Sequence, residues 1–81
     1  MEDIKTRIKA MLVERLFLPV EPSQIGDSES LAEKYGVDSV ALFDIAVGLE
    51  DEFGLSMSDE VFAPERFRDV NSIAQLVQSK S

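Results

Sequence analysis

A first helix is predicted from about Asp3 to Phe17, because apolar residues repeat there every three or four positions with charged residues between them. Pro19 and Pro22 follow, and proline cannot continue a helix, so the element ends before them. The repeating apolar positions are Ile4, Ile8, Met11, Leu12 and Leu16.

A long connection follows, from Leu18 to Asp38, and it is marked by proline, glycine and serine. Connections of this length inside a small domain usually serve a function or contain a short element of their own. The segment from Ser30 to Tyr35, closed by Gly36, is typical of such a turn.

The second helix is the most clearly marked element of the chain. Asp38 and Ser39 form a capping pair at its start, an uninterrupted helical run continues to Phe53, and Gly54 ends it. Five apolar residues at helical spacing form the stripe that we expect to face the core: Leu42, Ile45, Ala46, Leu49 and Phe53.

This helix carries more apolar surface than a core face needs. Val40, Phe43 and Val47 form a second stripe, here called the outer stripe, which is bordered by Asp44 and Asp51. Two interpretations are open. The long connection could bury the outer stripe, or the stripe could be a recognition face whose apolar anchors and acidic rim meet an apolar groove with a basic rim on a partner.

The rest of the chain is also helical in pattern. The serine and acids at 58–60 are predicted to cap a short third helix with Val61 and Phe62, and Pro64 opens a turn through Phe67. No alternating strand pattern occurs, so residues 1–81 are predicted to form one all-α domain. The expected fold is a four-helix bundle of three longer helices and one short one, with a long loop between helices one and two. The final helix is marked by Val70, Ile73, Ala74 and Val77.

The net charge of −8 lies entirely in one central segment. Between Tyr35 and Glu65 there are eight acids and no Lys or Arg, while the eight acids elsewhere are matched by all eight bases. Such a segment repels phosphate backbones and anionic lipid headgroups, so we expect no nucleic-acid or membrane-surface partner. A basic protein surface would be attracted to it, although an acidic face also serves solubility alone.

The chain contains no Cys, His or Trp. This composition excludes disulfides, thiolate or imidazole metal sites, a Cys nucleophile and acid–base catalysis by histidine. The sequence lacks the histidine and the nucleophile elbow of a serine hydrolase. The acids between residues 50 and 60 do not have the spacing of a calcium-binding loop. No apolar run approaches the ~20 residues of a membrane span, and the acidic start of the sequence is not typical of a signal peptide, so we expect a cytoplasmic protein. We also expect it to be a monomer.

Ser39 is the strongest candidate for a residue with a chemical role. The start of a helix offers N–H groups and a partial positive charge, which would accommodate a phosphate ester on the Ser39 hydroxyl. As structure alone, however, Asp-Ser before a helix is only an N-cap.

The segment Gly36–Val40, followed by an acidic helix that ends Leu-Glu-Asp-Glu-Phe-Gly at Leu49–Gly54, resembles the acyl carrier protein family. The resemblance extends over nearly the whole chain, including the lead-in from Ser30 to Gly36 and the closing apolar repeat. It implies that a phosphopantetheinyl transferase, with magnesium, attaches 4′-phosphopantetheine from coenzyme A to Ser39. The thiol of this arm then carries acyl groups as thioesters, so the protein is a carrier and not an enzyme.

The resemblance also implies roles for the neighbouring residues. Asp38 matches a contact point for the transferase and its metal, and the outer stripe matches the family's recognition face. Three acids match positions that pair with Arg and Lys on acyl-loading, condensing or acyl-transfer enzymes, namely Asp44, Glu50 and Asp51. Candidates to shelter an acyl chain inside the bundle are Phe43, Ile45, Ala46, Leu49, Phe62 and Ile73.

Several positions depart from the family pattern. Val40 stands where leucine is usual, Ala41 replaces a common acid, and Gly48 weakens its helix by ~1 kcal/mol relative to alanine. Together with the long aromatic segment 61–69, these departures favour a specialised carrier of a lipid or secondary-metabolite pathway. Two alternatives stay open: a peptidyl or aminoacyl carrier, and an unmodified acidic interaction module. In that module Ser39 is only a cap, and Ser39→Ala would cost ~1 kcal/mol while binding survives.

Overall fold

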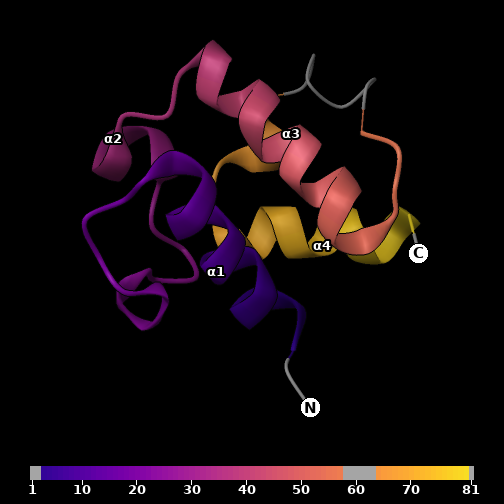
Figure 1. The fold of residues 1–81 in the computed structure, drawn as a ribbon, viewed down its shortest axis with the longest axis horizontal. Helices are drawn as coiled ribbons and strands as arrows, with labels where there is room; N and C mark the ends of the chain where they lie inside the picture. Colours follow the sequence, from indigo (N-terminus) through magenta and orange to yellow (C-terminus); the bar gives the residue numbers. More distant parts are fainter. Residues whose placement is uncertain (1–2, 58–63, 81) are drawn as a thin grey trace.

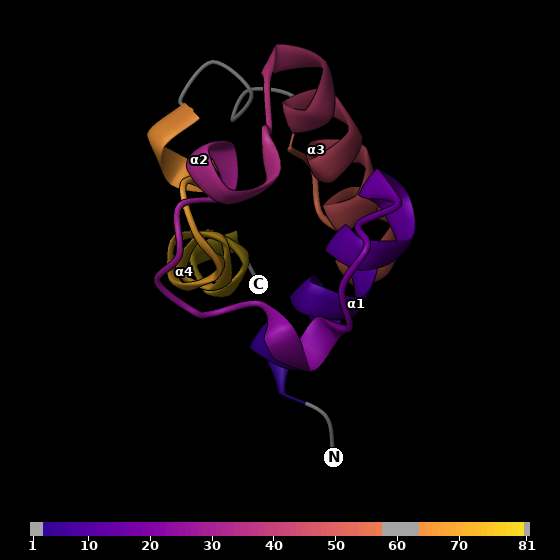
Figure 2. The ribbon, with the colours of Figure 1, turned by 90° about the vertical axis from the view of Figure 1, so that its left-hand side faces the viewer.

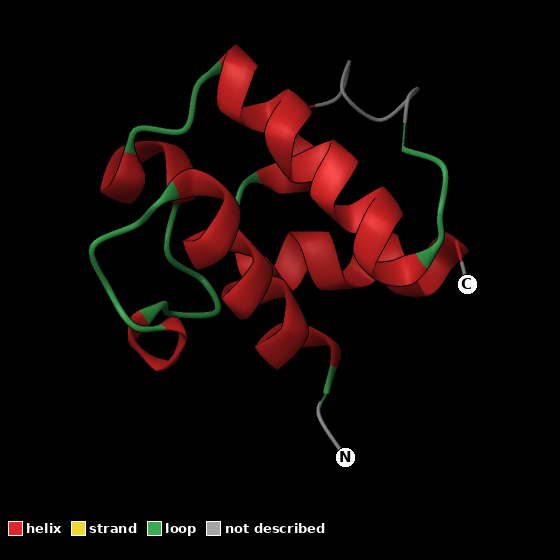
Figure 3. Ribbon diagram, in the orientation of Figure 1, coloured by secondary structure: helices red, strands yellow, loops and turns green. Residues whose placement is uncertain are grey.

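Four α-helices and two short 3-10 turns make up the computed structural model, which describes residues 3–57 and 64–80 (Figure 1). No strand occurs in these two segments (Figure 3). The all-helical prediction is therefore confirmed, with three longer helices, one short helix and a long loop after the first. The helices are α1 (Ile4–Leu16), α2 (Leu31–Tyr35), α3 (Ser39–Phe53) and α4 (Val70–Lys80), and the 3-10 turns are Pro22–Gln24 and Pro64–Phe67.

The helix boundaries follow the sequence signals closely. Asp3 caps the start of α1 and Phe17 is its C-terminal cap, as the hydrophobic repeat predicts. The short helix is α2, which forms where only a turn was expected, because Ser30 caps it by accepting a hydrogen bond from the Glu33 N–H at 3.3 Å. The short helix predicted around Val61 lies outside the described residues.

The core lies between the α1–α3 pair and α4. In Figure 2, α1 and α3 lie together on one side of the molecule, and α4 is seen end-on at the other. Of the predicted core stripe of α3, Ile45, Ala46 and Leu49 are buried, while Leu42 and Phe53 are half-buried at the edge of the core. The four apolar positions predicted for the final helix are all buried in α4: Val70, Ile73, Ala74 and Val77.

The long connection is a packed part of the fold. Ile25 is fully buried within it, and the carbonyl of Asp27 accepts a hydrogen bond from the Asn71 N–H at 3.0 Å. At its end, the Leu31 N–H donates to the carbonyl of Arg68 at 2.9 Å. These contacts hold the connection, and with it the start of α2, against the start of α4.

The start of α4 depends on Asp69, whose side chain is buried at 3% exposure. Its carboxylate accepts a hydrogen bond from the Ser72 N–H at 2.7 Å. Burial raises the pKa of Asp69, but the Ser72 hydrogen bond and the charge of Arg68 outweigh it, so the pKa lies below its ordinary value of 3.8. Because the folded pKa is depressed, this contribution to stability is present above the unfolded pKa and is lost as the pH falls through the folded one.

We therefore expect Asp69→Ala to lower the free energy of unfolding by about 1–2 kcal/mol near neutral pH. Asp69→Asn keeps an acceptor for the Ser72 N–H and should cost less. Urea unfolding at neutral pH and below about pH 3 measures both effects. The difference between wild type and Asp69→Asn should shrink in acid, and a constant difference would contradict the charge-dependent cap.

Candidate functional site

Ser39 is presented by a short, tightly fixed stretch of chain between α2 and α3. Gly36 ends α2 in the left-handed conformation, at φ 66°, which a side chain would oppose. Val37 then packs, half-buried, against the core, and this contact holds the turn in place. Asp38 and Ser39 follow on the surface, and Ser39 is the exposed first residue of α3.

The cap of α3 is Asp38, and the prediction that both residues cap the helix is corrected accordingly. The Asp38 carboxylate accepts a hydrogen bond from the Ala41 N–H at 3.0 Å, and its carbonyl accepts one from the Leu42 N–H at 2.9 Å. Ser39 lies within the helix, so its hydroxyl is not needed for capping. The interpretation of Ser39 as a structural cap therefore does not hold in this fold.

A small pocket of about 260 Å³ lies between the residues that flank the start of α3 and the segment that leads into α4. Val37 and Leu42, which line it, stand two residues before and three residues after Ser39 in the chain. The pocket has a largely apolar wall with two charged groups, Glu65 in the 3-10 turn and Arg68 directly after it. The other lining residues are Ala32, Val37, Leu42 and Phe67.

The outer stripe is exposed. Val40 is 78% exposed, Phe43 59% and Val47 45%, so the interpretation that the long connection buries this stripe is wrong. The connection packs instead on α1 and on the start of α4. Phe43 consequently does not line the core, which corrects its predicted role in sheltering an acyl chain, and Phe62 lies outside the described residues. The other four candidates are buried: Ile45, Ala46, Leu49 and Ile73.

The three acids predicted to meet a partner all have partners within the chain. Asp44 and Asp51 pair with the guanidinium of Arg15, at 3.5 Å and 2.8 Å. Glu50 accepts a hydrogen bond from the Met57 N–H at 2.8 Å and thereby ties the segment after α3 back to the helix. The Arg15 pairing was missed at the level of sequence, where the only signal for it is that the bases of the first helix complement the acids of the second.

Gly48 has a packing role that its helix propensity does not reveal. A Cβ atom at this position would lie 2.6 Å from the Met11 sulfur and 2.8 Å from Cδ of Arg15. Real Cβ contacts are essentially never that close, so a side chain at position 48 would displace the ends of the Met11 and Arg15 side chains that pack over it. Glycine at this position therefore lets the Met11 and Arg15 side chains of α1 pack closely on α3.

Comparison with known proteins now identifies the class of the chain. Residues 6–78 match the family described as the phosphopantetheine attachment site. The chain belongs to this family of carrier proteins, which are not enzymes and whose prosthetic group is 4′-phosphopantetheine. It is similar to an acyl carrier protein of Zymomonas mobilis subsp. mobilis, with 33% identity over 60 residues that cover 74% of each chain.

The expected resemblance is thus confirmed. Within residues 3–57 and 64–80, no helix combines the length and the apolar character needed to cross a membrane.

Proposed function

We propose that this chain is an acyl carrier protein that holds acyl intermediates on a phosphopantetheine arm attached to Ser39. The single observation that carries the assignment is the position of Ser39, exposed at the first residue of α3 and directly after the capping Asp38. The chain would present its cargo to enzymes of fatty-acid, lipid or polyketide-type biosynthesis.

The surroundings of Ser39 fit a phosphate ester. Attack of the Ser39 oxygen on the pantetheine-bearing phosphorus of coenzyme A would form a phosphodiester and release the adenosine bisphosphate half, with the serine proton passing to the transferase. The phosphodiester would carry a negative charge at the start of a 15-residue helix, where N–H groups and the helix dipole stabilise anions. When bound, the arm supplies the thiol that this cysteine-free chain lacks.

The pocket that Val37 and Leu42 help to line supports acyl cargo. Its apolar wall, formed in part by Val37, Leu42 and Phe67, would shield the first carbons of an acyl chain from water. The similarity to a protein named acyl carrier protein favours the same cargo over a peptidyl or aminoacyl group. Partner enzymes would dock on the exposed outer stripe, and the net charge of −8 favours partners with basic surfaces.

The proposal is tested by intact mass after incubation with coenzyme A, magnesium and a broad-specificity phosphopantetheinyl transferase. We expect the mass of the chain to rise by one phosphopantetheine. Trypsin leaves residues 35–66 as one peptide, because they contain no internal cleavage site, and fragmentation of that peptide separates Ser39 from Ser56 and Ser58. If several transferases leave a folded chain unmodified, the proposal fails and the unmodified acidic module becomes the better assignment.

Asp38 offers a way to separate the cap from a role in loading. Asp38→Ala should lower the free energy of unfolding by about 0.5–2 kcal/mol through loss of the hydrogen bond to the Ala41 N–H. Asn is an equally good cap, so Asp38→Asn should leave stability almost unchanged. If the carboxylate serves the transferase and its metal, Asp38→Asn should still reduce kcat/KM for loading roughly tenfold or more. Loading at the wild-type rate would restrict Asp38 to capping.

A further inference from the structure

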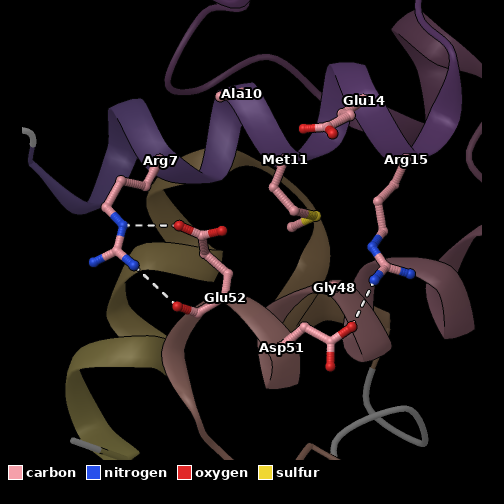
Figure 4. A pocket seen from close by; sticks show the side chains of 8 residues that line it. All are labelled: Arg7, Ala10, Met11, Glu14, Arg15, Gly48, Asp51 and Glu52. Atoms are coloured by element: carbon pink, nitrogen blue, oxygen red, sulfur yellow. Dashed lines mark hydrogen bonds and ion pairs between the residues drawn. The ribbon is translucent and has the colours of Figure 1, made fainter.

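The Arg15 side chain crosses α3 and forms ion pairs with the two acids that border the outer stripe, Asp44 and Asp51. Its side chain passes over Gly48, where only a hydrogen atom stands in its way, and its two terminal nitrogens reach Asp44 and Asp51 at 3.5 Å and 2.8 Å. Figure 4 shows the side chain extending from α1 past Gly48 to Asp51. The Arg15 guanidinium therefore occupies the position between Asp44 and Asp51 where a positively charged group of another protein would bind.

The acid pair borders the outer stripe. Asp44, Gly48 and Asp51 are spaced by four and three residues, which places them along one face of α3. Val47 is three residues after Asp44 and four before Asp51, so it lies beside both acids on the helix surface. The acids themselves are accessible, because their side chains are 48% and 72% exposed.

We propose that Arg15 is a specificity-determining residue of the docking face, because it competes with the partner's own cation for Asp44 and Asp51. The partner that fits is a protein surface with an arginine or lysine beside an apolar groove that receives the outer stripe. Such a partner must displace Arg15 to pair with the acids. This inference rests on the proposed carrier function for the nature of the partner.

Displacement is physically accessible at this position. Pairs between exposed charges are weak and exchange readily with solvent or competing ions. The Arg15 side chain is itself 30% exposed, so it can swing away from α3 without unpacking the core. Glycine at position 48 holds the resting position open, since a larger residue would push the Arg15 chain off the helix.

A second arginine on α1 provides the matched control. Arg7 pairs with the Glu52 carboxylate at 2.9 Å, donates to the Glu52 carbonyl at 2.9 Å, and lies 4.5 Å from the ring centre of Phe53. These contacts lie at the left of Figure 4, towards the opposite end of α1 from Arg15. Arg7→Gln and Arg15→Gln each remove one positive charge, so they share the same net charge.

The experiment is a titration of the unmodified chain with a hexa-arginine peptide at low ionic strength, followed by amide and Arg side-chain NMR signals. Arg15→Gln should bind the peptide about 2–5-fold more tightly than Arg7→Gln, as expected for an exposed charge pair that no longer has to be broken. The shift changes should centre on Asp44 and Asp51. In the wild type, the Arg15 Nε–H signal should move as the peptide displaces it.

Equal affinity of the two variants, or an Arg15 signal that stays fixed while the peptide binds, would overturn the proposal. Arg15→Lys keeps the net charge but has one ammonium group for two acids, so it should bind with intermediate affinity. If circular dichroism shows that Arg15→Gln does not fold, the Arg15→Lys variant is compared with the wild type instead, since the two have the same net charge. Because the titration uses the chain without its arm, a failure here and a failure of Ser39 loading are distinguishable.

Discussion

Replacing Ser39 with alanine is expected to leave the chain entirely at its unmodified mass under conditions that load the wild type. The effect should be complete, because the Ser39 oxygen is the atom that forms the new bond to phosphorus. The free energy of unfolding should change by no more than about 0.5 kcal/mol, since Asp38 caps α3 and Ser39 is exposed. Intact mass and urea unfolding measure the two effects on the same sample.

Ser30 supplies the matched control, because it also stands at the start of a helix. Its hydroxyl does cap, accepting a hydrogen bond from the Glu33 N–H at 3.3 Å. Ser30→Ala should therefore cost about 0.5–1 kcal/mol and load normally, the reverse of the pattern expected for Ser39→Ala. Loading of Ser39→Ala would show that another residue accepts the arm, and a loss of ~1 kcal/mol would show that Ser39 caps after all.

The contrast between these two serines shows what the sequence could predict at the site. Helical periodicity and the Asp-Ser and Gly signals located the start and end of α3 correctly, because these features depend on neighbouring residues in the chain. The division of work between Asp38 and Ser39 was not predictable, since both residue types cap helices well. Only the geometry, with the Asp38 carboxylate 3.0 Å from the Ala41 N–H, assigns the cap.

The outer stripe and its acids show a different limit. Three apolar residues at helical spacing are equally consistent with a second buried face and with an exposed one, and the choice depends on where a distant loop packs. Here Asp27 and Leu31 bind that loop to the start of α4, so it leaves the outer stripe of α3 uncovered. The pairing of Arg15 with Asp44 is likewise tertiary, because residues 29 positions apart meet only when α1 lies along α3.

Leu49→Ala is expected to destabilise the fold far more than a truncation on the exposed face of α3. Leu49 is fully buried, at 0% exposure, within the core formed by α1, α3 and α4. Truncating a buried leucine removes apolar contacts and leaves a cavity, which costs about 2–5 kcal/mol. Domains of this size have a total stability near the lower end of about 5–15 kcal/mol, so Leu49→Ala should remove a large part of it.

Val47→Ala is the matched control for this change, two residues away on the same helix. Val47 is 45% exposed in the outer stripe, so its truncation should alter the free energy of unfolding by no more than about 0.5 kcal/mol while weakening partner binding. Thermal and urea unfolding of the wild type and the two variants compare the core with the outer stripe directly. Equal losses at the two positions would mean that the outer stripe is buried in solution, and the docking face would then have to be sought elsewhere on the molecule.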